Sequence, residues 1–293
     1  MIRLGTRASV LARAQASTVG EAIAELTGQP VDLVGVRTEG DGPSAAPPRP
    51  GVFVSALRDA LLAGTVDVVV HSYKDLPSGE VEGLLVAAVP ERANPCDVLF
   101  SPLGGLAELP AGARVGTSSP RRAAALRRLR PDLVVVAVRG NVETRLEQAR
   151  SGEVDAVVVA AAGLQRLGLL DPSVGVLDPA LVVPAPAQGA LAVECRADDR
   201  LITVVGQLDD TASRVAVAAE RAVLAGLGAS CDTAVGAHAS WISERVLLLT
   251  ADLAGHAGVD YARVSRSATV DDAAAATRLG TTVAGSLLAE PAD

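Results

Sequence analysis

The stretch from Arg114 to Arg122 combines residue types that bind anions. An apolar position is followed by a glycine, three hydroxyl residues, a proline and two arginines. Hydroxyl side chains cap helices and proline suits the first helical position, so the pattern predicts a helix over residues 121–130, capped by Thr117, Ser118 or Ser119. The helix start offers free N–H groups, and Arg121 and Arg122 add guanidinium groups that match carboxylate or phosphate. On these residues alone, an anion site and a well-capped surface helix are both open.

A second stretch, Arg139 to Arg145, has the same character. Arg139 ends an apolar run, Asn141 is a typical helix cap, and Arg145 follows four residues later. Residues 114–145 contain eight arginines and only two acids, although the whole chain has a net charge of −8. Screening over roughly 8–10 Å lets such a local cluster attract anions in an acidic protein. The alternative is a capped helix with solvated arginines.

A third stretch brings an acid and a base together at the end of a strand. The valine-rich run at residues 66–70 is followed by His71-Ser-Tyr-Lys-Asp-Leu-Pro77, which contains Lys74 and Asp75. In open α/β sheets, ligands bind at the carboxyl ends of strands. Lys74 and Asp75 are therefore expected at an edge of the sheet where a ligand can bind.

Composition limits the classes of protein that this chain can represent. A length of 293 residues with 49% hydrophobic and 20% charged residues predicts a globular chain of two or three domains. The acidic balance argues against a nucleic-acid partner, and no apolar run reaches the ~18–20 residues of a membrane span, so we expect no membrane partner and a cytoplasmic location. The spacing of Cys96, Cys195 and Cys231 predicts neither a metal site nor disulfides. The three histidines show no partner pattern and are expected in packing or surface roles.

The elements that must position these residues alternate in the order typical of α/β domains. A loop over residues 38–51, rich in proline and glycine, is predicted to be a mobile lid. The segment 184–190 is predicted to be a linker, after which a strand returns to the first domain. Further strands are predicted at residues 3–6, 31–36, 133–138, 191–195, 233–240, 245–252 and 259–265, and helices at 9–26, 53–63, 271–289 and from Asn141 and Thr211.

An internal repeat supports two α/β domains of similar plan. Residues 3–9 resemble residues 114–120, and residues 64–70 resemble residues 152–159, in the same order. Chance similarity of valine-rich strands is the alternative. We predict α/β domain 1 from residues 1–90 and 189–207, α/β domain 2 from residues 95–185, and a small α+β domain from residues 211–293. Two such domains enclose a cleft, where a ligand is expected.

The motifs together resemble those of the porphobilinogen deaminases, also called hydroxymethylbilane synthases. The resemblance covers nearly the whole chain, and the set is specific although each motif alone is not. Its motifs are Ser72-Tyr-Lys-Asp-Leu-Pro77, Gly116-Thr-Ser-Ser-Pro-Arg-Arg122, Arg139-Gly-Asn-Val-Glu-Thr-Arg145, Gln188-Gly-Ala190 and the Cys231 loop.

This resemblance implies a fold and a reaction. The fold would have two periplasmic-binding-protein-like α/β domains around the cleft, with the α+β domain attaching a cofactor. The transferase would polymerise four porphobilinogen units, with release of ammonia, to the linear tetrapyrrole hydroxymethylbilane of heme and porphyrin biosynthesis. The growing pyrrole chain would be built on a dipyrromethane cofactor bound covalently through Cys231. A monomer is expected.

The resemblance also assigns roles to residues. Asp75 matches the catalytic aspartate, because loss of ammonia leaves a methylene-pyrrolenine cation that a carboxylate stabilises while it shuttles protons. The residues that would bind cofactor are Cys231, Lys74, Thr117, Ser119, Arg121, Arg122, Arg139, Asn141 and Arg145. Those that would bind substrate are Arg7, Ser9, Gln15, Arg166, Gln188 and Gly189. No metal ligands are expected.

The chain departs from the family pattern near two of these motifs. The loop before residue 52 lacks a lysine and a second glycine that are usual there, and Ala229-Ser230 precede Cys231 where glycines are common. Neither departure changes Asp75, Cys231 or the paired arginines.

Two other functions compete with this interpretation. A non-catalytic, periplasmic-binding-protein-like receptor for an anionic small molecule would share the two-domain cleft, but no signal peptide is seen and a cysteine-bearing third domain is unexplained. A nucleotide-binding transferase would need a phosphate-binding glycine motif, and neither a P-loop nor GxGxxG is present.

Overall fold

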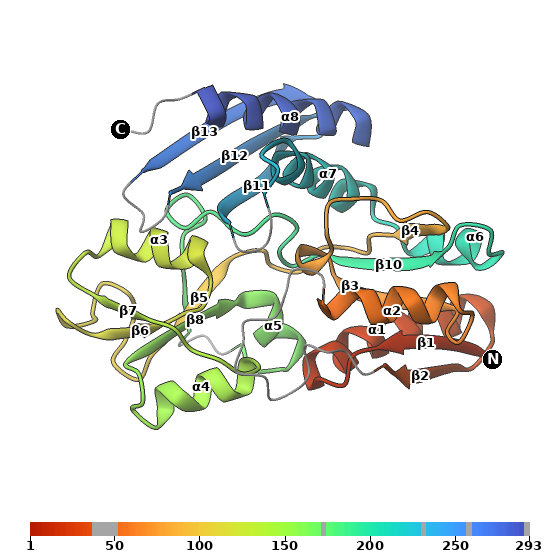
Figure 1. Ribbon diagram of the computed structural model, residues 1–293, viewed down its shortest axis with the longest axis horizontal. Coiled ribbons are helices and arrows are strands. Elements are labelled where there is room, and N and C mark those ends of the chain that lie inside the picture. Colours follow the sequence, from red (N-terminus) through yellow and green to blue (C-terminus); the bar gives the residue numbers. More distant parts are fainter. Residues whose placement is uncertain (37–51, 171–173, 230–232, 256–259, 290–293) are drawn as a thin grey trace. The chain divides into compact units, whose positions relative to one another are not determined.

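The computed structural model describes residues 1–36, 52–170, 174–229, 233–255 and 260–289 (Figure 1). The chain divides into two compact units, which are described separately. The first unit comprises residues 1–93 and 190–214, and the second comprises residues 94–189 and 215–293. The predicted lid at residues 38–51 lies outside the described residues.

The first unit is built on a five-stranded sheet with the order β2-β1-β3-β10-β4. Strands β2, β1 and β3 are parallel, and β10 pairs antiparallel with both β3 and β4. This confirms the predicted return of the chain after residue 190. The strands are β1 (Ile2–Thr6), β2 (Val31–Gly35), β3 (Val68–Ser72), β4 (Leu84–Ala88) and β10 (Leu191–Arg196).

Helices cover both faces of this sheet because side chains alternate along each strand. On one face, Val68 and Val70 pack with Ile23 of α1 (Val10–Thr27). On the other face, Val69 packs with Leu57 and Leu61 of α2 (Val52–Leu62). The short helices η2 (Tyr73–Asp75), α6 (Leu201–Val205) and η3 (Gly206–Leu208) complete the unit.

The second unit begins with a sheet of the same plan, in the order β7-β6-β8-β5-β9. Strands β7, β6 and β8 are parallel, and β5 runs antiparallel to β8. Val158 faces Leu126 of α3, whereas Val157 and Val159 face Leu146 of α4. The elements are β5 (Asp97–Phe100), β6 (Arg114–Gly116), α3 (Pro120–Leu129), β7 (Val134–Val136), α4 (Val142–Arg150), β8 (Ala156–Ala160), α5 (Ala161–Arg166) and β9 (Gly175–Val176).

The internal repeat extends to individual contacts. At the start of β1 and β3, the Asp67 N–H donates to the Arg3 carbonyl at 2.8 Å, and the Asp67 carboxylate accepts from the Arg3 backbone N–H at 2.9 Å. Arg114 and Asp155 make the corresponding bonds at the start of β6 and β8, with the side-chain bond at 2.6 Å. The predicted similarity of the two α/β sheets is thereby confirmed at equivalent positions.

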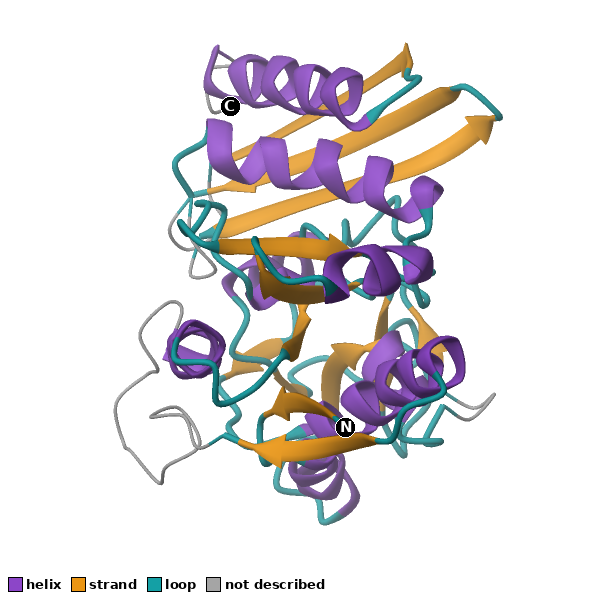
Figure 2. Cartoon of the chain, turned by 90° about the vertical axis from the view of Figure 1, so that its right-hand side faces the viewer, coloured by secondary structure: helices purple, strands orange, loops and turns teal. Residues whose placement is uncertain are grey.

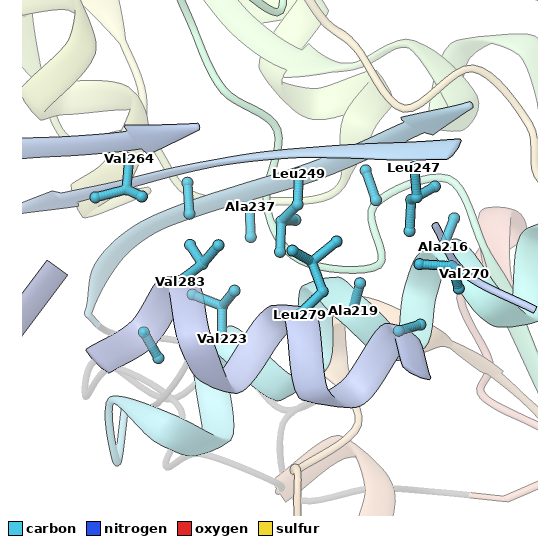
Figure 3. Close-up of a cluster of buried hydrophobic side chains, with 14 of the residues drawn as sticks. Ala216, Ala219, Val223, Ala237, Leu247, Leu249, Val264, Val270, Leu279 and Val283 are labelled. Atoms are coloured by element: carbon cyan, nitrogen blue, oxygen red, sulfur yellow. The ribbon is translucent and has the colours of Figure 1, made fainter. Parts of the chain in front are cut away.

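The C-terminal part of the second unit is a three-stranded antiparallel sheet covered by two helices, as predicted. Strands β11 (Ala234–Ser243), β12 (Val246–Ala254) and β13 (Tyr261–Thr269) pair in sequence order. Helices α7 (Thr211–Gly226) and α8 (Ala273–Ala289) lie side by side on one face (Figure 2). Leu247 and Leu249 of the sheet point toward Leu279 of α8 and form the core with it (Figure 3). The fold class is therefore the predicted one, whereas the three-domain division stays a prediction.

Candidate active site

Lys74 and Asp75 lie in the single turn η2, directly after strand β3. The turn is closed by a bond from the Leu76 backbone N–H to the Tyr73 carbonyl, and the Tyr73 N–H donates to the Ala190 carbonyl at 3.0 Å. Leu76 is buried and fixes the end of the turn, while Lys74 and Asp75 are half-buried. The carboxylate of Asp75 is therefore held at the carboxyl end of β3, where the sequence predicted it.

A cluster of buried charged residues lies next to the end of β3. Glu194 of β10 accepts two hydrogen bonds from Arg58 Nε and one from Arg58 Nη2 at 2.8 Å, and its Oε2 lies 3.2 Å from His71 Nε2. Burial raises the pKa of Glu194, but the hydrogen bonds from His71 and Arg58 outweigh burial and leave this pKa lowered. His71 is buried, in agreement with the predicted packing role, and it also has a specific partner that the sequence did not indicate.

The residues predicted after β1 lie at the same sheet edge as Asp75. Arg7 follows β1 directly, and Ser9 caps α1 by accepting from the Ala12 N–H at 3.3 Å. Gln15 is buried in the next turn of α1. Because β1 and β3 are neighbouring parallel strands, their carboxyl ends meet at one edge. Arg7, Ser9 and Asp75 therefore share this edge of the first unit's sheet.

The corresponding edge of the second unit carries the capped helix starts. Ser119 caps α3 through the Arg122 N–H at 3.5 Å, and Asn141 caps α4 through the Thr144 N–H at 2.9 Å. Thr117 is buried, and its N–H donates to the Val136 carbonyl. Both predicted caps are confirmed.

Arg121 and Arg122 are buried and already face a carboxylate of this chain. Arg122 Nη2 lies 2.7 Å from Oδ1 of Asp97, and Arg121 Nη1 lies 2.7 Å from Oδ2. Arg121 also donates to the Val183 carbonyl, and Arg122 donates to the Val158 carbonyl. Nε of Arg121 is buried without a hydrogen-bond partner among the described residues. The sequence placed the two arginines correctly at the helix start but did not reveal Asp97.

Two other arginines are desolvated without a carboxylate partner. Arg145 Nε donates to the Gly140 carbonyl at 3.0 Å, and Arg166 Nη2 donates to the Gly189 carbonyl at 2.7 Å. Burial lowers the pKa of Arg166 to about 10, and burial together with the charge of Arg122 lowers that of Arg145. Across the described ranges, neither of them has an ion pair with Asp or Glu, which suits an anionic ligand. Arg139, at the end of the run after β7, is exposed.

The predicted linker is an ordered, buried segment. Gln188 is fully buried, and its side-chain amide donates to the Pro95 carbonyl at 2.7 Å and to Asp97 Oδ1 at 2.8 Å. Ala187 and Gly189 have φ angles of 62° and 88°, a left-handed backbone that glycine adopts readily and alanine does not. The backbone N–H of Ala187 is held by the buried carboxylate of Glu220 at 2.7 Å.

Cys231 lies outside the described residues. It stands three positions before Ala234, which packs against Ala124 of α3. Cys195 is fully buried in β10 as predicted, and burial raises the pKa of its thiol to about 12. Among the residues that the structure describes, no His, Cys, Asp and Glu side chains are grouped as metal ligands would be, and no helix is long and apolar enough to cross a membrane.

The chain matches two family profiles. Residues 2–204 match "Porphobilinogen deaminase, dipyromethane cofactor binding domain" and residues 214–289 match "Porphobilinogen deaminase, C-terminal domain". Among curated proteins, it is 48% identical to the porphobilinogen deaminase of Thermobifida fusca, over 99% of this chain and 94% of that protein. It is 47% identical to the one from Acidothermus cellulolyticus, over 100% of this chain and 90% of that protein.

Solved structures of lower identity are similar as well. One is a periplasmic substrate-binding protein of an ABC transporter from Coxiella burnetii, with a TM-score of 0.46, 16% identity, and coverage of 75% of this chain and 97% of that chain. Another is the methionine-binding protein MetQ, with a TM-score of 0.46, 13% identity, and coverage of 75% and 93%.

Proposed function

The chain belongs to the porphobilinogen deaminase family, and we propose that Asp75 is its catalytic carboxylate and that arginines at both sheet edges bind pyrrole carboxylates. The transferase polymerises porphobilinogen to hydroxymethylbilane, in tetrapyrrole biosynthesis, with dipyrromethane as its cofactor. A non-catalytic receptor for an anionic small molecule is not favoured, because the family match extends over both the α/β domains and the C-terminal domain.

The binding role is carried by the desolvated arginines Arg145 and Arg166. Both guanidinium groups are half-buried, and desolvation of a charge without a counter-charge is unfavourable, so their side chains fit a ligand that brings its own carboxylates. The orphaned Nε of Arg121 is a further donor of the same kind. Each pyrrole derived from porphobilinogen carries an acetate and a propionate side chain, so the dipyrromethane cofactor is a polycarboxylate, and the residues present match its charge.

We assign the cofactor to residues of both units. Cys231 would hold it covalently. Lys74 of the first unit would pair with its carboxylates, and the second unit would contribute Thr117, Ser119, Arg121, Arg122, Arg139, Asn141 and Arg145. When bound, the cofactor supplies the pyrrole end on which the chain is built. Arg7, Ser9, Gln15, Arg166, Gln188 and Gly189 would serve the incoming porphobilinogen.

Asp75 acts through its position at the end of β3. Asp75 is half-buried on the hydrogen-bonded turn η2, so its carboxylate is open to a ligand. A carboxylate oxygen beside a pyrrole N–H accepts a hydrogen bond from it and opposes the positive charge that develops as ammonia leaves. The buried ion pairs of Glu194 with Arg58 and His71 connect strand β3 to β10 and α2.

The experiment combines intact mass with ammonia release. We expect the purified chain to carry an adduct that is lost in Cys231→Ser, and Asp75→Asn to abolish ammonia release while its circular dichroism stays that of the wild type. Substantial turnover by Asp75→Asn would refute the catalytic role. An unmodified wild-type chain that binds porphobilinogen without releasing ammonia would refute the enzymatic function itself.

The proposals on oligomeric state, location and partners rest on the composition of the chain. We propose a monomer in the cytoplasm, without nucleic-acid or membrane partners, made of the three domains 1–90 with 189–207, 95–185 and 211–293. Size-exclusion chromatography with light scattering checks the monomer, and limited proteolysis that cuts near residues 90 and 209 would support the domain division.

A further inference from the structure

A buried carboxylate lies behind the arginine pair at the start of α3. Asp97, the first residue of β5, is fully buried. Its Oδ1 accepts from Arg122 Nε at 3.1 Å and Nη2 at 2.7 Å, and from Gln188 Nε2 at 2.8 Å. Its Oδ2 forms an ion pair with Arg121 at 2.7 Å. These four residues are called the Asp97 cluster.

The charges of this cluster do not cancel. Two guanidinium groups and one carboxylate leave one positive charge in excess, at a place where Arg121 and Arg122 are only 7% and 6% exposed. Burial lowers the pKa of Arg121 and so does the charge of Arg122, while Asp97 opposes both effects. Asp97 therefore holds two like charges together and still leaves the pair attractive to an anion.

The cluster also fixes how the guanidinium groups are turned. The Asp97 carboxylate accepts hydrogen bonds from Nε and Nη2 of Arg122, and the Val158 carbonyl accepts one from its Nη1 at 3.0 Å. The Val183 carbonyl holds Arg121 Nη1 at 2.7 Å. A long side chain that is ordered before its ligand arrives loses less entropy on binding.

We propose that Asp97 is a positioning residue for the reaction: it aligns Arg121 and Arg122 toward the ligand carboxylates and keeps both charges in place. This inference rests on the proposed function, in which the two arginines bind cofactor. Asp97 itself contacts the arginines and Gln188 and is not a catalytic residue. The competing view is that Asp97 only ties β5 to α3 and stabilises the fold.

The test uses Asp97→Asn, which keeps the side-chain shape and removes the charge. Asp67→Asn is the matched control, since Asp67 pairs with Arg3 at 2.7 Å at the opposite, amino-terminal end of β3. Both variants are prepared as holoenzyme, and KM and kcat for porphobilinogen are measured well below their melting temperatures, with intact mass reporting cofactor content. We expect Asp97→Asn to raise KM about tenfold or to lose bound cofactor, and Asp67→Asn to do neither.

Two further variants separate alignment from stability. Arg122→Lys keeps the charge but lacks the planar guanidinium group that donates to both Asp97 and the Val158 carbonyl. We therefore expect it to raise KM as Asp97→Asn does. In the double variant Asp97→Asn, Arg122→Lys, the effects on KM should be less than additive, because both changes act through one group. Arg122→Lys also keeps the test informative if Asp97→Asn does not fold.

The outcomes separate this inference from the function on which it rests. Unchanged KM and cofactor content in Asp97→Asn or in Arg122→Lys, beside a wild type that carries the adduct and releases ammonia, would overturn the positioning role alone. A wild type without adduct and without ammonia release would overturn the proposed function.

Discussion

At the scale of single residues, the informative feature is a partly desolvated cation without a carboxylate partner. Arg130 and Arg145 are both half-buried, but Arg130 pairs with Asp132 at 2.6 Å, whereas Arg145 donates to the Gly140 carbonyl and has no ion pair with Asp or Glu among the residues that the structure describes. A fold gains little from such an arrangement by itself, because a desolvated charge is stabilised by a partner. We infer that the partner of Arg145 comes with the ligand.

Arg145→Gln tests this inference. Removal of a charge-assisted hydrogen bond costs on the order of 1.5–3 kcal/mol, which corresponds to about a tenfold to a hundredfold rise in KM for porphobilinogen or to loss of cofactor. Arg114→Gln is the control, since exposed Arg114 starts β6 at the opposite edge and donates to the Glu153 carbonyl. Steady-state kinetics of both holoenzymes give the result. Equal KM values for the two variants would contradict the assignment.

The thiol of Cys195 should be inert in the native protein. Its pKa is about 12 because the side chain is buried, against roughly 8.5 for an exposed cysteine. Alkylation requires the thiolate, so the native chain at pH 9 should leave Cys195 unmodified, and the unfolded chain should react. Peptide mass spectrometry after iodoacetamide treatment measures this. Rapid labelling of Cys195 at pH 9 without unfolding would show that the strand opens readily.

At the scale of elements, the two α/β sheets use the same construction. Gly5 of β1 and Gly116 of β6 pair with Val69 and Val157, and an added Cβ would approach those valines to 2.9 and 3.1 Å. A larger side chain would therefore push the neighbouring parallel strand away at the very edge that carries the site. The repeated glycine therefore lets the neighbouring parallel strands approach closely at this edge in both sheets.

Helix α8 offers a matched pair of glycines that should respond in opposite directions. A Cβ at Gly280 would lie 2.1 Å from the Ala219 carbonyl oxygen of α7, whereas one at Gly285 meets nothing within 4 Å. Gly280→Ala should destabilise the protein by about 1–3 kcal/mol through overpacking. Gly285→Ala should stabilise it by roughly 0.5–1 kcal/mol, because alanine favours the helix. Urea unfolding of both variants measures the difference, and the same sign of change in both would contradict the packing of α7 on α8.

The elements also show what the sequence could and could not predict. The caps at Ser119 and Asn141 were predicted correctly because capping depends on residues within one turn. The partners of the buried charges were missed because they are distant in sequence: Asp97 lies 25 positions from Arg122, and Glu194 lies 123 positions from His71. Only the folding of the sheets brings these partners together, and no local sequence pattern indicates the contacts. The strand β9, two residues long, likewise depends on its neighbour β5.

At the scale of the whole molecule, the proposed ligand set is divided between the two compact units. Lys74 and Asp75 belong to the first unit, and Arg145, Arg166 and the Asp97 cluster belong to the second. A covalently attached polycarboxylate that these cations bind would add stability to the folded chain alone, since the unfolded chain has no arranged cations. The loaded protein should therefore melt above Cys231→Ser, which cannot carry the cofactor.

The size of this increase in melting temperature shows which residues bind the cofactor. If both units contribute, Lys74→Gln and Arg145→Gln should each reduce the difference in melting temperature between the loaded chain and the same variant carrying Cys231→Ser. Arg114→Gln should leave that difference unchanged, whatever its effect on the melting temperature itself. Differential scanning calorimetry of the eight proteins, with intact mass to confirm loading, provides the comparison. A reduction by Arg145→Gln alone would assign the cofactor to the second unit, and equal melting of loaded and unloaded wild type would show that neither unit binds it.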